Sequence, residues 1–198
     1  ETTGLDPAHH RVFLVAVRDN RGLATTLEAR GDTDADEAEL LRELITLIRS
    51  TDPDVIENHN LHGFDLPFLA HRAKMLRIPL LLGRLDGVPL RPRPGPRGRT
   101  RYVAPGRELI DTLDAVRRHD FSARDLPGHG LKAVARHFGL AGPEREYVPG
   151  AEIHATFLTD PERVRRYALD DVAEAAGLAR LLGGAAFALA RMAPRRYE

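Results

Sequence analysis

The chain has 198 residues, 42% hydrophobic and 29% charged, which is the composition of one globular domain large enough to bury a core. Twenty-nine basic residues balance 29 acidic ones, so the chain has no overall positive field and must meet any anionic partner locally. The lack of cysteine excludes disulfides, thiolate metal sites and thiol nucleophiles. Because no apolar run is long enough to span a membrane and no basic-then-apolar leader is present, we expect a cytoplasmic protein without a membrane partner.

The first half of the chain alternates between strand and helix patterns. Two β-rich runs flank a turn sequence, which is typical of a hairpin. The next segment has acidic residues in its first turns and apolar residues at helical spacing, as an amphipathic helix does. A short buried strand and a second helix with proline in its first turn follow. These elements are expected at 11–17, 23–29, 32–50, 55–56 and 64–78.

The second half begins with a segment rich in Pro, Gly and Arg, at about 84–107. It cannot form a core, and we predict an exposed loop there. Its basic side chains either track the phosphates of a single strand or belong to a solvated insertion. They are Arg84, Arg91, Arg93, Arg97, Arg99, Arg101 and Arg107. Ordered structure is expected again at 107–118 and 130–140, and a last helix from Thr159 or Asp160 to 182.

Tyr167 and Asp171 lie four positions apart in this last helix and therefore share a face. Apolar residues flank that face, so Asp171 is expected at the edge of the core. Because burying an unpaired carboxylate is costly, such an aspartate needs a cation, a helix cap or a metal ion. Taken alone, the pair favours an ordinary aspartate over a ligand.

A second aspartate, Asp65, stands where the strand at 55–56 has ended and a helix begins. In α/β proteins, functional groups lie beyond the carboxyl ends of strands, although an aspartate there can also be a plain helix cap. Asn60 can simply terminate the strand, and Phe64 is predicted to be a core residue. The residues alone leave both interpretations open.

Together with the opening sequence Glu-Thr-Thr, these stretches resemble the DEDD superfamily of 3′-5′ exonucleases. The likeness is to the proofreading exonuclease domain of family-B DNA polymerases, including stand-alone relatives. The pattern Asn-x-x-x-Phe-Asp-x-Pro is complete at 60–67, and Tyr-x-x-x-Asp at 167–171. The tyrosine indicates the DEDDy subfamily, since Arg166 occupies the position of the other subfamily's histidine. The resemblance implies a ribonuclease H-like fold, a mixed β-sheet flanked by helices, in a single domain over 1–198.

The resemblance also implies a two-metal-ion mechanism with Mg²⁺ or Mn²⁺ as cofactors. Carboxylates suit these hard ions. Glu1 and Asp171 would hold the ion that activates the water, and Asp65 would hold or orient the second. Tyr167, with a reference pKa near 10, would orient the attacking water instead of acting as a general base.

Substrate contacts follow from the same resemblance. Asn60 and Phe64 would hold the 3′-terminal nucleotide by a polar contact and by stacking, which suits sequence-independent capture of a single strand. Thr2, Thr3 and Leu5, in the opening segment and its turn, would contact the terminal sugar or base.

One departure from the family pattern concerns its first aspartate, which would lie two residues before Glu1, on a central strand of the sheet. We therefore expect the first central strand to be missing and the 198 residues to be a fragment of a longer protein, an expectation that the apolar segment 183–198 also favours. The spacing of Asp6, His9 and His10 does not let them substitute for it, and we predict that they are surface residues. Histidines without a zinc-ligand spacing are expected to be satisfied or solvent-facing. They are His59, His62, His129 and His137.

The expected function is a metal-dependent 3′-5′ exonuclease acting on single-stranded DNA ends in proofreading or repair, with a fused or partner polymerase or repair module. A non-catalytic nuclease-fold domain that binds nucleic acid or another polypeptide remains an alternative because of the absent aspartate. An RNA-directed exonuclease is a further alternative, since the sequence does not show the contacts that discriminate the sugars. An Asp-x-Glu strand upstream in the full gene would separate the first two.

Overall fold

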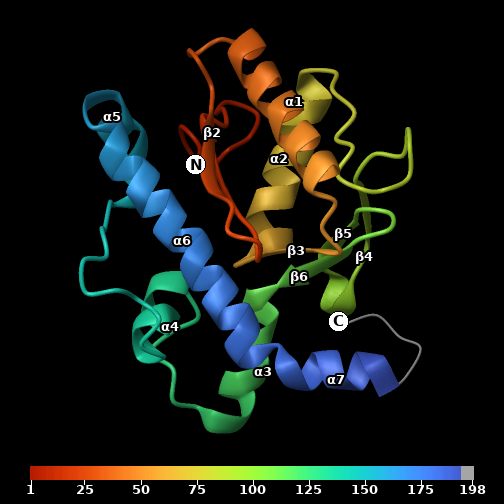
Figure 1. The fold of residues 1–198 in the computed structure, drawn as a ribbon, viewed down its shortest axis with the longest axis vertical. Helices are drawn as coiled ribbons and strands as arrows, with labels where there is room; N and C mark the ends of the chain where they lie inside the picture. The colour runs from red at the N-terminus through yellow and green to blue at the C-terminus, as the bar shows by residue number, and fades with distance from the viewer. Residues whose placement is uncertain (193–198) are drawn as a thin grey trace.

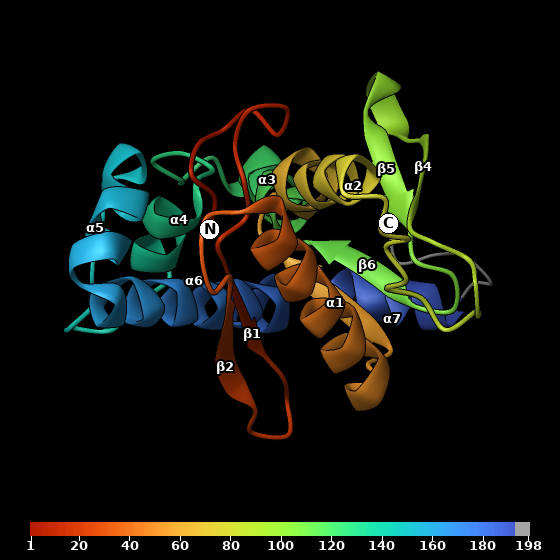
Figure 2. The same ribbon diagram turned by 90° about the horizontal axis from the view of Figure 1, so that it is seen from above.

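The computed structural model describes residues 1–192, apart from the side chains of residues 97, 185, 186 and 189. Figures 1 and 2 show helices packed around short strands. The strands are β1 (Leu14–Arg18), β2 (Ala24–Glu28), β3 (Val55–Asn58), β4 (Arg91–Pro94), β5 (Thr100–Val103) and β6 (Glu108–Asp111). The helices are α1 (Asp34–Thr51), α2 (Leu66–Met75), α3 (Thr112–Ala123), α4 (Leu131–His137), α5 (Ile153–Thr159), α6 (Pro161–Leu182) and α7 (Gly184–Met192). No helix in this part of the chain is long and apolar enough to cross a membrane.

The predicted N-terminal hairpin is confirmed. β1 and β2 pair antiparallel from Leu14↔Glu28 to Arg18↔Ala24. Side chains of β1 alternate between its two faces. Leu14 and Ala16 pack with the α6 cluster, whereas Val15 and Val17 pack with the cluster that α1 and α2 bury. This ladder is thus the middle layer between two layers of helices, as in the expected α/β fold.

β3 and β6 form a second, parallel ladder with register Val55↔Glu108 to Asn58↔Asp111. The carboxyl ends of the two strands therefore lie side by side. Within residues 1–192, β1 pairs with β2 and β3 pairs with β6, and α6 contacts both ladders. The expected mixed sheet is divided into these two ladders. Among the described residues, no strand forms hydrogen bonds with both of them.

The segment 84–107 differs from the predicted loop. Its middle forms an antiparallel hairpin, β4–β5, in which Pro92 pairs with Tyr102 and Pro94 with Thr100. Figure 2 shows this hairpin projecting from the body. Proline lacks an N–H donor, but an edge strand can place it where no ladder bond is required, so the Pro-rich composition concealed a strand. The apolar C-terminal segment begins with α7, and its residues 193–198 lie outside the described part of the chain.

Candidate active site

Tyr167 and Asp171 lie on α6, and their shared face is at the core boundary as predicted. Asp160 caps the helix, its carboxylate accepting a hydrogen bond from the Arg163 amide at 3.2 Å, and Pro161 is its first residue. Tyr167 is buried in the cluster that contains Leu14 of β1. Asp171, one turn further, keeps 22% of its side chain exposed. The tyrosine is therefore a core residue, and the aspartate faces partly outward beside it.

Glu1 is held beside the start of β1. Residues 1–3 run antiparallel to 11–14, with the Phe13 amide donating to the Glu1 carbonyl at 3.1 Å and the Thr3 amide to the Arg11 carbonyl at 2.9 Å. The negative charge of Glu1 raises the pKa of both Tyr167 and Asp171. The structure thus brings Glu1 near Tyr167 and Asp171, which lie more than 160 positions further along the chain.

Two cations that the sequence analysis did not single out lie against this pair. Arg145, whose side chain is only 3% exposed, donates to Asp171 and to Glu174, the latter at 2.7 Å, and lies 3.4 Å from Asp170. Lys132 donates to the Tyr167 hydroxyl oxygen, and its Nζ lies 3.9 Å from Asp171 Oδ2. Asp171 is therefore held between two basic groups.

Burial and neighbouring charge set the protonation of the pair. Burial raises the pKa of Asp171 to about 6; Lys132 and Arg145 oppose that rise, and Glu1 reinforces it. Burial, with the charges of Asp171 and Glu1, also raises the pKa of Tyr167 above its ordinary value. Tyr167 is therefore neutral at physiological pH and can donate its hydroxyl proton.

The turn that carries Asp65 is built by a distant residue, Asp111, at the end of β6. Its carboxylate caps α3 through the Leu113 amide at 3.0 Å and accepts from the amides of Asn60 at 2.8 Å and His62 at 3.0 Å. Asn60 adopts a left-handed conformation with φ 62°, and residues 61–65 form one π-helical turn. A Cβ added at Gly63 would lie 2.2 Å from Asn60 Oδ1, so only glycine fits there without a shift of Asn60.

Asp65 itself is a half-buried carboxylate with little compensation. It accepts a hydrogen bond from the side-chain amide of Asn58 at 3.2 Å, and its side chain does not cap α2, which argues against the plain helix-cap interpretation. Burial raises its pKa to about 7, with the nearby amino group of Glu1 acting in the opposite direction and Asp111 raising it further. Asp65 therefore holds its proton to a higher pH than an ordinary aspartate does.

The residues that are predicted to contact the substrate differ in their hydrogen bonds and exposure. The Thr2 hydroxyl donates to the Gly4 carbonyl at 2.7 Å, and the Thr3 hydroxyl accepts from the Arg11 amide at 3.0 Å, so both stabilise the opening turn. Leu5, at the tip of that turn, is 81% exposed. Phe64 packs against Phe68 with ring centroids 5.6 Å apart and is half-buried.

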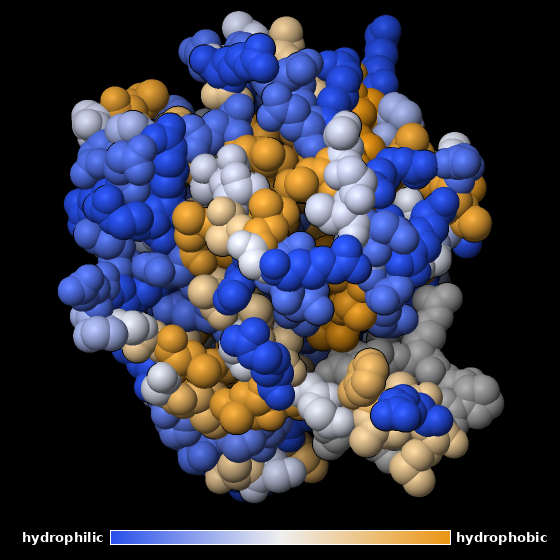
Figure 3. All heavy atoms as spheres, viewed as in Figure 1, coloured by the Kyte–Doolittle hydropathy of each residue, from blue (hydrophilic) through white to orange (hydrophobic). Residues whose placement is uncertain are grey.

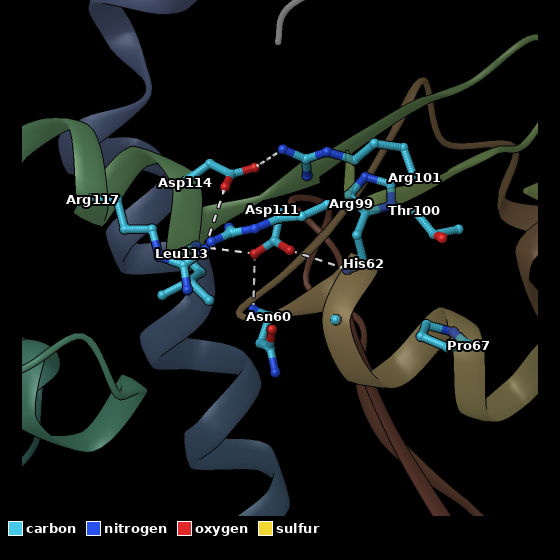
Figure 4. A pocket seen from close by; sticks show the side chains of 11 residues that line it. Asn60, His62, Pro67, Arg99, Thr100, Arg101, Asp111, Leu113, Asp114 and Arg117 are labelled. Carbon is cyan, nitrogen blue, oxygen red and sulfur yellow. Dashed lines mark hydrogen bonds and ion pairs between the residues drawn. The ribbon is translucent and has the colours of Figure 1, made fainter. Parts of the chain in front are cut away.

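Asn60 lines a pocket of about 430 Å³ (Figure 4). The predicted histidines are engaged as expected. Both ring nitrogens of His59 have hydrogen-bond partners, and His62 accepts from the Tyr102 amide at 3.1 Å.

The donor chemistry of the three carboxylates fits a hard divalent cation, because Asp65 and Asp171 have raised pKa values that a nearby positive charge would relieve. In residues 1–192, however, no three acidic or histidine side chains converge at ion-binding spacing. Asp171 instead contacts Arg145 and Lys132, and Asp65 contacts Asn58.

The residues that sequence reasoning missed are Lys132, Arg145, Asp111 and Glu174. Lys132 carried a weak signal, as one of two lysines in a chain with 29 basic residues. Arg145 lies in an irregular segment without any periodic pattern, and its partners lie 25 to 29 positions further along the chain.

Comparisons with known proteins show the family to which the chain belongs. Residues 26–134, which include Asp65 but not Glu1 or Asp171, match the family model described as the DNA polymerase family B exonuclease domain. DNA polymerase 2 of Aeropyrum pernix is 30% identical over 88% of this chain, and a DNA polymerase of Pyrococcus glycovorans is 35% identical over 68% of it. The family B DNA polymerase from Pyrobaculum calidifontis superposes with a TM-score of 0.75 and 32% identity over 89% of the chain. The chain spans only 20%, 17% and 22% of these three proteins, respectively.

Proposed function

Because the chain belongs to the family of exonuclease domains found in family B DNA polymerases, we propose that it removes nucleotides from the 3′ end of single-stranded DNA in proofreading or repair. One observation carries the proposal. The charge of Glu1 acts on both Tyr167 and Asp171, and Asp65 is a half-buried carboxylate with a raised pKa. These four residues would form the catalytic site.

The cofactors would be two divalent ions, Mg²⁺ or Mn²⁺, with Glu1 and Asp171 holding one and Asp65 the other. When bound, such ions make a water nucleophilic at neutral pH and offset the charge of the leaving 3′ oxygen. The half-buried carboxylates of Asp65 and Asp171 would gain stability from that positive charge, since their raised pKa values reflect poorly compensated negative charge.

Tyr167 would position the attacking water. Lys132 donates to the Tyr167 oxygen, so the remaining proton of that hydroxyl is free to point at Asp171 or at a water. Burial keeps the phenol neutral by raising its pKa. Tyr167 therefore acts as a fixed donor, and its loss would slow the reaction without removing a metal ligand.

Substrate would be held by the opening turn and by the turn that carries Asp65. Leu5 offers an exposed apolar side chain to a base or sugar, with Thr2 and Thr3 fixing the shape of its turn. Asn60 would provide a polar contact, and Phe64 a ring edge, to the 3′-terminal nucleotide. A polymerase or repair module, fused or separate, would supply the strand.

A non-catalytic domain that binds nucleic acid or another polypeptide is the second candidate. It is favoured by the contacts of Arg145 and Lys132 with Asp171, because basic groups at that carboxylate compete with a metal ion. A domain in which Arg145 and Lys132 always remain on Asp171 would bind DNA without cutting it.

Degradation of a 5′-labelled single-stranded DNA with Mg²⁺ or Mn²⁺ tests the proposal. The substrate is given to this chain and to any longer form that the gene encodes, with an RNA of the same sequence in parallel. We expect a ladder that shortens from the 3′ end and disappears with EDTA or with Asp171→Ala. Asp170→Ala is the matched control. Asp170 is adjacent to Asp171, but its side chain is 42% exposed and its contact with Arg145 is long, at 3.4 Å. Folded protein that binds the DNA without shortening it would establish the non-catalytic alternative.

A further inference from the structure

The pocket beside the turn that carries Asp65 has a volume of about 430 Å³. Figure 4 shows its walls: the turn with Asn60 and His62, the strand β5 with Thr100 and Arg101, and the start of α3. Pro67 and Leu113 supply apolar atoms, and the other lining side chains are mostly polar or charged. It is a site separate from the carboxylates of the proposed catalytic centre.

The acidic groups of this pocket are already neutralised. Asp111 accepts three backbone N–H bonds, from Asn60, His62 and Leu113. Asp114 accepts a hydrogen bond from Arg101, whose side chain is nearly buried. Neither carboxylate therefore needs a cation from outside.

The basic side chains in the same walls have few acidic or hydrogen-bonding partners. The guanidinium of Arg99 has no hydrogen-bond or ion-pair partner among the residues that the structure describes. Arg117 has only a distant one, with Asp114 at 3.9 Å. The Nε of Arg101 is buried and makes no hydrogen bond within the described residues. The pocket thus presents unused N–H donors and net positive charge, which a phosphate group satisfies through the planar fork of arginine.

We propose that this pocket binds a phosphodiester group of the substrate strand, upstream of the 3′ nucleotide that is removed. The inference rests on the proposed function, because Asn60 both lines the pocket and would hold the 3′-terminal nucleotide. When the 3′ end of a strand lies at Asn60, the next phosphates upstream in that strand lie along the pocket. Arg99 and Arg117 would then fix the position of the strand without discriminating its sequence.

Binding of fluorescein-labelled oligothymidylates, measured by anisotropy in the presence of EDTA, tests this site without requiring catalysis. The double variant Arg99→Ala/Arg117→Ala removes the two least engaged cations. The matched control is Arg118→Ala, because Arg118 is the exposed neighbour of Arg117 on α3 and does not line the pocket. Thermal unfolding of each variant confirms that all remain folded.

We expect the double variant to lose about tenfold in affinity for oligonucleotides that reach the pocket. The slope of log affinity against log salt should fall by about 0.7 for each phosphate contact that is lost. Replacing single linkages with neutral methylphosphonates should identify one linkage whose substitution weakens the unmodified protein but not the double variant. Equal affinity and equal salt slope in the double variant and Arg118→Ala would overturn the proposal, as would a folded unmodified protein that binds no oligonucleotide.

Hydrolysis of the p-nitrophenyl ester of thymidine 5′-monophosphate separates this proposal from the proposed function, because the ester is too short to span both sites. The double variant should hydrolyse it at the unmodified rate while it loses oligonucleotide affinity. If no protein hydrolyses the ester or DNA but the double variant still loses affinity, the exonuclease proposal fails and the phosphate site stands.

Discussion

At the residue scale, the carboxylates of the site differ in what surrounds them. Asp171 contacts two basic side chains, whereas Asp65 is half-buried and accepts a hydrogen bond from the Asn58 side-chain amide. Such an uncompensated carboxylate destabilises the folded chain whenever it is ionised. This electrostatic cost is what a divalent cation would relieve.

We predict that Asp65→Asn stabilises the protein at pH 8 in EDTA, by about 2 kcal/mol. The pKa of Asp65 is about 7 in the folded state, above its ordinary value of 3.8. Between these values the folded chain keeps a proton that the unfolded chain has lost, so stability falls as pH rises from about 4 to about 7. Urea unfolding across this range should give a flatter pH dependence for the variant. Asp86→Asn, at a 90% exposed side chain, is the control, and a variant as pH-dependent as the unmodified chain would contradict this account.

Arg145 has the opposite role, since it compensates the charge on α6. Arg145→Ala leaves Asp171 and Glu174 without their guanidinium partner, and we expect a loss of about 3 to 5 kcal/mol in the free energy of unfolding. Arg145→Lys should recover part of that loss, because it keeps the charge but not the fork.

The measurement is again denaturant unfolding, with Arg166→Ala as the control. Arg166 is 59% exposed, and its ion pair with Glu146 is long, at 4.0 Å. Its replacement should therefore change the free energy of unfolding by no more than about 0.5 kcal/mol. Similar losses for Arg145→Ala and Arg166→Ala would show that the buried pairs have no special role.

At the element scale, the turn between β3 and α2 determines where Asn60 and Asp65 lie. The sequence predicted a strand end followed by a helix, and this is confirmed. It did not predict the π-helical turn or the left-handed Asn60, because both depend on Asp111, which is 51 positions further along the chain. The β4–β5 hairpin was missed for a different reason, since proline and arginine conceal the alternation of an edge strand.

Gly63→Ala should therefore disturb the substrate contacts. The new Cβ would collide with Asn60 Oδ1, so Asn60 must move, and we expect single-stranded DNA affinity to fall about fivefold with a stability loss of about 1 to 2 kcal/mol. Anisotropy and thermal unfolding measure the two effects. Gly142→Ala is the control, because a Cβ there meets no atom within 4 Å. Unchanged affinity in Gly63→Ala would show that the position of Asn60 does not matter for DNA.

At the scale of the whole molecule, the site exists because separate segments converge on α6 and β1. Periodicity predicted α6 and the shared face of Tyr167 and Asp171, and the motif resemblance predicted the fold class and the family, which the comparisons confirm. Composition alone would have indicated only an α/β domain. Neither periodicity nor composition could predict the contacts of Lys132 and Arg145 with Tyr167 and Asp171. These contacts depend on how the segment 130–150 folds back on α6.

The buried pair Glu37–Arg72 extends this convergence to the N-terminal segment. Their side chains lie 2.5 Å apart between α1 and α2, and Glu37 also accepts from the Val12 amide at 2.9 Å. Since residues 11–14 pair with residues 1–3, this ion pair helps to fix Glu1 beside α6. The position of one catalytic candidate thus depends on packing across the whole domain.

The central claim is that Glu1, Asp65 and Asp171 hold divalent ions beside Tyr167. Anomalous diffraction from crystals grown with Mn²⁺ and thymidine 5′-monophosphate tests it most directly. We expect Mn²⁺ peaks roughly 3.5 to 4 Å apart, one at Asp171 and Glu1 and one at Asp65, with Arg145 still bound to Glu174. Crystals of a DNA-cleaving protein in which no Mn²⁺ lies at these carboxylates, and in which Arg145 and Lys132 remain on Asp171, would contradict it.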